Sequence, residues 1–311
     1  MSTAIMVKKK GRTPIQKIAR HWQWYLLLLP PFIWLVVFRY IPMVGIQIAF
    51  RDYRGGSIFS GDWVGLQHFR NFFRSPAAFD IIGNTMGISL YNLIAGFPLP
   101  IILALCLNAC VSPKLTKSVQ MITYAPYFIS TVVMVGILQQ LIHPQFGIIN
   151  SLLASLGLGG NLNILAEPKL FSSVFVWSGI WQFTGYSSIM YIAVLSGVDP
   201  TLHEAAVVDG ASRFKRVIWI DLPMIIPTAT ILLILNVGQI MNVGFEKVFL
   251  MQNTMNLSAS DVISTFVYRR GLEGAQFAFA AAVGLFNSVV NMILLVIVNQ
   301  IAKRLGDTSL W

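Results

Sequence analysis

The sequence predicts an all-α membrane protein, and three observations support that prediction. Of its 311 residues, 56% are hydrophobic and only 11% are charged, whereas a soluble domain has about 25% charged residues. The mean hydropathy is +0.69. Six stretches are long and apolar enough to cross a bilayer as helices, which takes about 20 residues each. We attribute the net charge of +10 to the positive-inside bias of membrane proteins rather than to nucleic-acid binding.

The six predicted spans follow one another along the chain with polar interruptions between them. They cover residues 24–48, 81–111, 119–142, 170–196, 222–245 and 275–302. The last five contain no Asp, Glu, Lys or Arg, and the first contains only Arg39, near one end. Pro30, Pro31, Pro98 and Pro100 lie inside spans, where neighbouring helices or cavity water can satisfy the carbonyls that proline leaves unpaired. We therefore expect about six transmembrane helices, with kinks at these prolines.

The basic residues orient the predicted spans. With the N-terminus inside, more than half of the 22 Lys and Arg residues fall in the inner segments, which are shorter than the outer ones. This bias predicts that both termini are cytoplasmic. We expect a basic N-terminal tail (1–23), one transmembrane domain (24–302) and a C-terminal tail (303–311). The apolar run from Trp24 is longer than a signal peptide and lacks a small-residue cleavage site, so it should remain as the first span.

The loop before the fifth predicted span, residues 197–221, is a polar and basic island in this apolar chain. Its start, Asp199-Pro200, is typical of a helix N-terminus, with Asp as the N-cap and Pro at the first helical position. Gly210 can adopt backbone angles that other residues avoid, and should therefore end that helix. The pattern predicts a short helix, a sharp turn and a second helix that enters the membrane.

The spacing in this loop resembles a known motif. Glu204-Ala205-Ala206 is followed by Gly210 and then by Ile220-x-Leu222-Pro223, which resembles the cytoplasmic EAA signature of ABC importer permeases. In that family the signature forms a coupling helix that docks into a cleft of the ATPase subunit. The resemblance implies that five residues couple the chain to an ATPase: Glu204, Ala205, Ala206, Asp209 and Gly210. The alternative is an ordinary amphipathic helix on the membrane surface.

Two further segments narrow the resemblance. The spans and the motif position are similar to those of binding-protein-dependent sugar permeases of the maltose type. FRYIPMVGIQIAFRDY (38–53) and DVISTFVYRRG (261–271) resemble a subfamily that transports complex polysaccharide fragments. The resemblance covers most of the chain, although this chain lacks the large periplasmic insertion of the larger maltose permease subunit.

This resemblance implies several partners in a bacterial inner membrane. They are a second, homologous permease, two ATPase subunits and an extracytoplasmic binding protein. The binding protein would deliver an oligosaccharide or polysaccharide fragment, either neutral or acidic. The ATPase subunits would use ATP and Mg²⁺. Because this chain has no G-x-x-x-x-G-K-[ST] loop, we expect it to bind no nucleotide cofactor itself.

Polar and aromatic residues inside the spans are candidates for a substrate path. Sugars present hydroxyl groups and apolar ring faces, which suit amides, hydroxyls and aromatic rings. Trp177 and Trp181 lie four residues apart and so share one helix face. The candidates are Asn84, Asn92, Trp177, Trp181, Gln182, Tyr186, Asn236, Gln239, Asn242, Asn287 and Asn291. The alternative for each is a hydrogen bond to a neighbouring helix.

Other classes of function remain as alternatives. One is an ABC permease for another solute. Another is an ion-coupled secondary transporter, which the lack of ionisable groups in five spans disfavours. We find no nucleophile–base set and no metal cluster, and Cys106 and Cys110 are interpreted as small apolar residues. Arg269 and Arg270, in a long outer loop, could contact a binding protein, an anionic saccharide or solvent.

Overall fold

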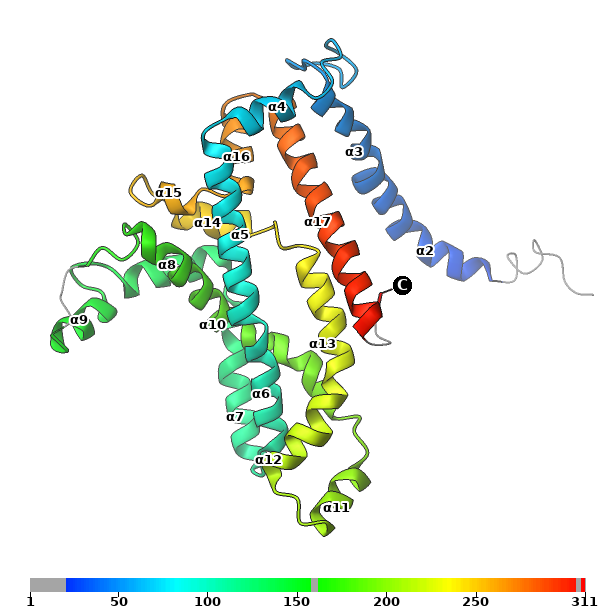
Figure 1. The fold of residues 1–311 in the computed structure, drawn as a ribbon, viewed down its shortest axis with the longest axis vertical. Coiled ribbons are helices and arrows are strands. Elements are labelled where there is room, and N and C mark those ends of the chain that lie inside the picture. The colour runs from blue at the N-terminus through cyan, green and yellow to red at the C-terminus, as the bar shows by residue number, and fades with distance from the viewer. Residues whose placement is uncertain (1–20, 158–161, 306–308, 311) are drawn as a thin grey trace, which may run out of the picture.

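The computed structural model describes residues 21–157, 162–305 and 309–310, and most of them are helical (Figure 1). Within these residues the only β-structure is one isolated bridge between Arg51 and Trp63. The prediction of an all-α chain is therefore confirmed. Most of the predicted N-terminal tail, residues 1–20, and part of the C-terminal tail lie outside the described residues.

The first span is one continuous helix, Trp22–Phe50. It consists of α2 (Trp22–Leu35), η1 (Val36–Tyr40), α3 (Ile41–Met43) and η2 (Val44–Phe50). Its first part stands away from the other helices, and η2 packs on the last long helix (Figure 1). None of the α2 side chains is buried. The arrangement leaves a long apolar surface for lipid or another protein.

Three further helices are long and apolar enough to cross a membrane. α5 (Ala77–Gly96) and α6 (Pro98–Ala109) together form one span and follow α4 (Gln67–Arg74). Another comprises α12 (Arg213–Arg216), η4 (Val217–Asp221) and α13 (Leu222–Val237), and the last is α17 (Phe277–Leu305). The predicted fifth span, 222–245, therefore begins earlier and ends earlier than expected, because residues 238–244 form turns and coil.

The predicted third span, 119–142, is sharply bent. α7 (Pro113–Tyr124) with η3 (Ala125–Phe128) meets α8 (Thr131–Leu141) at 104°. Ile129 is extended at the break, and the Ser130 side chain caps α8 by accepting from Val133 N–H. The pair counts as one span only if both arms together cross the membrane. α8 and α9 (Ile148–Ser155) extend to one side of the long helices (Figure 1).

The centre of the protein is α10 (Pro168–Leu195), which packs on α5, α6, α7 and α13. It buries Phe171, Val176 and Ile180 in a core cluster. Its serines, Gln182 and glycines make it less apolar than the four spans above. Length and composition thus support four spans, or five with the bent pair, and the predicted count of six is not established.

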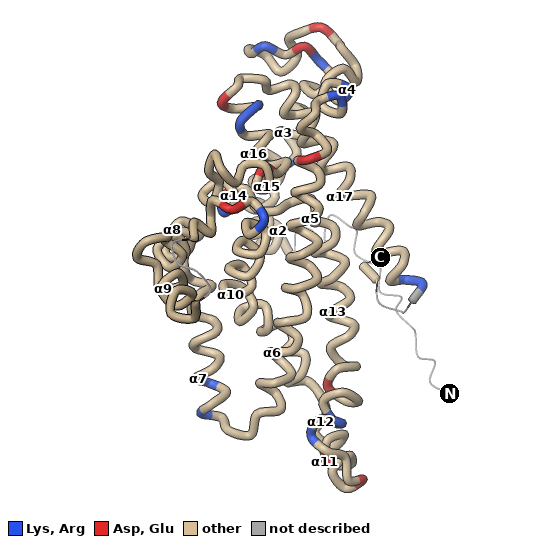
Figure 2. Tube along the Cα trace, turned by 60° about the vertical axis from the view of Figure 1, so that its left-hand side comes forward, with Lys and Arg blue, Asp and Glu red and all other residues tan. Residues whose placement is uncertain are grey.

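Short helices close one side of the molecule, and the predicted coupling helix lies at one end. α14 (Phe245–Met251), α15 (Leu257–Ser260), α16 (Ile263–Tyr268) and η5 (Arg269–Glu273) connect α13 to α17. α11 (Pro200–Val208) lies at the opposite end of the molecule from α4 (Figure 1). Most charged residues lie towards these two ends (Figure 2).

Candidate functional site

The loop with the EAA-like spacing folds as the sequence predicts. The Asp199 side chain caps α11 by accepting the Thr201 N–H at 2.9 Å, with Pro200 as the first helical residue. This hydrogen bond lowers the pKa of the Asp199 carboxyl. Gly210 adopts φ +74°, a left-handed conformation that suits glycine. α12 then begins at Arg213 and runs directly into α13.

The outer face of α11 is available to a partner. Val207 and Val208 are 55% and 87% exposed. Four of the five predicted coupling residues are also exposed, namely Glu204, Ala205, Asp209 and Gly210, whereas Ala206 is half-buried. These two neighbouring valines lie at a tip of the molecule, where a partner protein can reach them.

The inner side of α11 is attached to two spans through one carboxylate. The His203 Nε2 lies 3.2 Å from the Asp221 Oδ1, and the Asn108 Nδ2 donates to the same oxygen at 3.3 Å. Asp221 is 2% exposed. These contacts join α11, α6 and η4 beside a cavity of about 540 Å³. Sequence reasoning missed this group, although Asp221 lies inside the motif itself.

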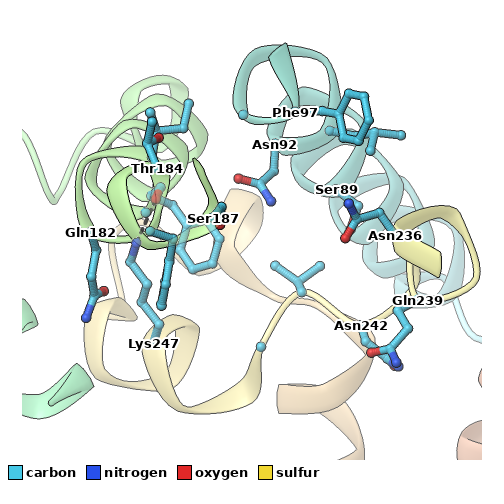
Figure 3. Close-up of a pocket in the computed structure, with 18 of the residues that line it drawn as sticks. Ser89, Asn92, Phe97, Gln182, Thr184, Ser187, Asn236, Gln239, Asn242 and Lys247 are labelled. Atoms are coloured by element: carbon cyan, nitrogen blue, oxygen red, sulfur yellow. Dashed lines mark hydrogen bonds between the residues drawn. The ribbon is translucent and has the colours of Figure 1, made fainter. Parts of the chain in front are cut away.

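A larger cavity of about 820 Å³ lies between α5, α6, α10, α13 and α14. Six of the predicted path residues line it: Asn92, Gln182, Tyr186, Asn236, Gln239 and Asn242. Figure 3 shows Asn92 pointing into the space between the helices, with Asn236 and Ser89 beside one another across from α10. The lining thus combines amides and hydroxyls with apolar side chains, which is the combination that small-molecule sites use.

Three predicted asparagines lie elsewhere and bind other parts of the chain. Asn84 donates to the backbone carbonyls of Ser258 and Asp261 at 2.9 and 3.1 Å. Asn287 donates to Asn242 Oδ1 at 2.9 Å, and Asn291 Oδ1 accepts the Met241 N–H at 3.0 Å. The alternative to substrate contact was a hydrogen bond to a neighbouring helix, and of these partners only Ser258 lies in a helix, whereas Asp261, Asn242 and Met241 lie in the connections.

The two tryptophans on α10 also lie outside the cavity lining. Both are more than half exposed, and Trp177 Nε1 donates to the Tyr91 hydroxyl at 2.9 Å. Gln182 lines the cavity but its amide is engaged, since it donates to the Ile129 carbonyl at 2.9 Å. Gln182 thereby satisfies the backbone oxygen at the break between η3 and α8.

Lys247 and Glu246 line the cavity, and sequence reasoning missed both. Lys247 is only 9% exposed. Its Nζ donates to the Phe175 carbonyl at 2.8 Å and lies 4.6 Å from the centre of the Phe175 ring. Burial lowers the pKa of Lys247 to about 8. The only signal in the sequence was a charged pair directly after the fifth apolar stretch.

The outer arginines have partners within the chain. The Arg269 guanidinium pairs with the Asp261 carboxylate, and Arg270 lies over the Phe266 ring at 5.8 Å. Burial raises the pKa of Asp261 although Arg269 acts in the opposite direction. Arg269 therefore stabilises the connection between α15 and η5.

Apolar spans around a cavity lined by both polar and apolar side chains, with a protruding capped helix at one end, fit a membrane transport subunit. Residues 96–307 match the family described as binding-protein-dependent transport system inner membrane component. The chain belongs to this family, and is a permease subunit of an ABC importer.

Two curated relatives match over nearly their full length. The chain is 36% identical to the polygalacturonan/rhamnogalacturonan transport system permease protein YteP of Bacillus subtilis, over 100% of this chain and 97% of that protein. It is 37% identical to Protein LplB of the same organism, over 99% and 96%.

Two solved structures share the fold. One is a bacterial ABC transporter involved in the import of the acidic polysaccharide alginate, with a TM-score of 0.86 and 38% identity over 93% of this chain and 98% of that chain. The other is a bacterial alginate ABC transporter in complex with an alginate pentasaccharide-bound periplasmic protein. It has a TM-score of 0.88 and 37% identity over 96% and 100% of the two chains.

Proposed function

We propose that this chain is one half of the pore of an ABC importer for acidic oligosaccharides, the fragments of polyuronates. The observation that carries the proposal is the 820 Å³ cavity, whose lining provides amides, hydroxyls and a buried lysine. Amides and hydroxyls can hydrogen-bond sugar hydroxyl groups, and a lysine attracts a carboxylate. The relatives support the substrate class, since galacturonan and alginate are both polymers of uronic acids.

Neutral substrates have weaker support among the relatives. The arabinooligosaccharide permease AraP of Bacillus subtilis is 25% identical over 91% of this chain. This identity is well below the 36% of YteP. The sn-glycerol-3-phosphate permease UgpA of Escherichia coli, whose named substrate is an anion but not a saccharide, is 26% identical over 93% of this chain. The curated relative named for a polyuronate, YteP, thus has a higher identity than the relative named for a neutral oligosaccharide, AraP.

We propose that α11 is the coupling helix and lies in the cytoplasm, where an ATPase subunit binds it. Its exposed valines and the exposed Glu204 provide the contact surface. Movement of α11 can reach the cavity because α12, η4 and α13 form one helix from Arg213 to Val237, and Asn236 near its far end lines the cavity. A second permease would complete the pore, two ATPases would supply ATP hydrolysis, and a binding protein would deliver the saccharide at the end opposite α11.

A reconstituted importer tests this function. The two permeases, the ATPase and the binding protein in proteoliposomes should accumulate a galacturonate pentasaccharide only when ATP is present. The control substrate is a neutral arabino-oligosaccharide of the same length. Uptake without ATP, as an ion-coupled transporter would show, or a preference for the neutral saccharide would contradict the proposal.

A variant tests the coupling role separately. Glu204→Lys reverses the charge of an exposed α11 residue, which also lines the 540 Å³ cavity, and should abolish ATP-driven uptake while the protein still inserts into the membrane. The matched control is Lys215→Glu, which reverses a charge in the adjacent exposed segment. Normal uptake by Glu204→Lys would contradict the proposal that α11 contacts the ATPase.

A further inference from the structure

Lys247 is a buried cation without a carboxylate partner. Ion pairs in the described part of the chain join Arg54 to Asp52, His203 to Asp221 and Arg269 to Asp261, and none of them includes Lys247. Lysines are almost never fully buried without a partner, because desolvation of the ammonium is costly. The position therefore has a physical cost that packing alone does not explain.

The hydrogen bonding of Lys247 leaves room for a ligand. A lysine ammonium has three N–H donors, and one donates to the Phe175 carbonyl at 2.8 Å. The Phe175 ring gives a further favourable contact without using a donor. Two donors thus remain on a side chain that lines the 820 Å³ cavity. Figure 3 shows Lys247 rising from α14 towards α10 at the edge of this space.

The neighbouring helix keeps the ammonium accessible. An ideal Cβ built on Gly179 would lie 3.2 Å from the Lys247 Nζ, closer than most real Cβ contacts. Glycine at this position therefore leaves space beside the ammonium that any other residue would fill. The Phe175 carbonyl, one turn earlier on α10, fixes the direction in which the lysine points.

The other charged residue that lines the cavity does not neutralise Lys247. Glu246 is adjacent in the chain but exposed, so water and salt screen its charge, whereas the buried lysine is screened much less. The remaining cavity residues are uncharged, with Tyr186 and Tyr191 as the other titratable side chains. A carboxylate that entered the cavity would be attracted most strongly to the Lys247 ammonium, the one cation among the described residues that line it.

We infer that Lys247 selects the cargo of the pore, by binding a uronate carboxylate through the two free N–H groups of its ammonium as the saccharide passes. This inference rests on the proposed function, because it assumes that acidic saccharides enter the cavity. It adds a specificity-determining residue on α14, outside the apolar spans, and a position for the carboxylate next to Phe175.

The test compares an acidic oligosaccharide with its neutral counterpart. Uptake of a galacturonate pentasaccharide and of its carboxyl-reduced form, in which each uronate is a neutral hexose, is measured in proteoliposomes with the complete importer. The readout is the ratio of the acidic to the neutral uptake rate. Because the same binding protein serves all variants, its own preference cancels when their ratios are compared.

Lys247→Gln should lower this ratio about tenfold or more, the loss expected for a hydrogen bond to a charged group. The matched control, Lys247→Arg, retains the charge and should keep most of the ratio. Equal losses of acidic and neutral uptake in Lys247→Gln would mean that the lysine is structural, and would overturn the inference. Failure of the proposed function looks different, since the wild-type importer would then not prefer the acidic saccharide at all.

A measurement on the wild-type protein covers the case in which Lys247→Gln fails to insert. The pKa of Lys247 is about 8, so the ammonium loses its proton as the pH rises from 7 to 9. The acidic-to-neutral ratio should fall over this interval in the wild type and stay constant in Lys247→Arg, because arginine remains protonated. Glu246, Tyr186 and Tyr191 are present in both proteins, so their contribution is common. A flat wild-type profile would contradict the inference.

Discussion

The attachment of α11 to the spans through Asp221 gives the sharpest prediction about energy transfer. Asp221 is buried, and its Oδ1 is the shared acceptor of His203 on α11 and Asn108 on α6. Because a carboxylate oxygen only accepts, the Nε2 of His203 must be the donor of the first bond. Replacing His203 by alanine removes this link while leaving the exposed contact surface of α11 unchanged.

The magnitude follows from the chemistry of the bond. A hydrogen bond to a charged group contributes about 1.5–3 kcal/mol, which corresponds to a change of about tenfold to a hundredfold in an equilibrium constant. His203 is partly exposed, with a side-chain exposure of 27% against 3% for Asp221, so water can replace part of the interaction. We therefore expect the lower end of that range for His203→Ala.

The assay is the number of saccharides imported per ATP hydrolysed in proteoliposomes. His203→Ala should retain ATP hydrolysis but lower this number about tenfold, since α11 would move without the spans. Asp221→Leu, which removes the shared acceptor, should have a similar effect, and the double variant should be no worse than either single one. Lys215→Ala, in the adjacent exposed helix, is the control. Independent and additive losses in the double variant would refute a direct link between the two residues.

Two glycines give further predictions. An alanine Cβ at Gly185 would lie 2.0 Å from the Thr123 carbonyl oxygen, so Gly185→Ala should displace α7 from α10 and lower the free energy of unfolding by about 1–3 kcal/mol. Thermal unfolding in detergent measures this loss. The control is Gly87→Ala, which has open space around it and should leave the Tm unchanged. Gly210→Ala places a side chain at φ +74°, at a cost of about 1–2 kcal/mol. ATP-driven uptake should fall while insertion into the membrane is retained. Equal uptake by Gly210→Ala and by the control Gly136→Ala would contradict a role for the turn.

The local features of this chain could be predicted from its sequence. Asp199-Pro200 starts α11, and Gly210 adopts the left-handed conformation after it, because capping and positive φ depend on residue type within a few positions. The long helices followed from apolar composition over tens of residues. These signals are local, so they need no knowledge of the neighbouring helices.

The failures arise where distant segments decide the structure. The bend between η3 and α8 interrupts an apolar stretch, and the Ile129 carbonyl that it frees is satisfied by Gln182, 53 residues away. Lys247 follows the fifth apolar stretch with no sign of burial in the sequence, because its burial depends on α10, through Phe175. Asn108 and Asp221 are 113 residues apart. No spacing rule connects such pairs, since tertiary packing alone brings them together.

The helix from Arg213 to Val237 connects the proposed coupling site on α11 with the cavity that contains Lys247. Its 25 residues extend about 37 Å at a rise of about 1.5 Å per residue, with the π-helical turn η4 at the end that carries Asp221. At the other end, Asn236 lines the cavity directly before the turns of residues 238–244 lead to Lys247. A displacement of α11 would therefore reach Asn236 through this helix, and it would reach Lys247 through α10, which ends at Leu195 shortly before α11 and holds Lys247 through Phe175. Any difference between the two movements would change the distance between the Asn236 amide and the Lys247 ammonium, and with it the binding of the saccharide.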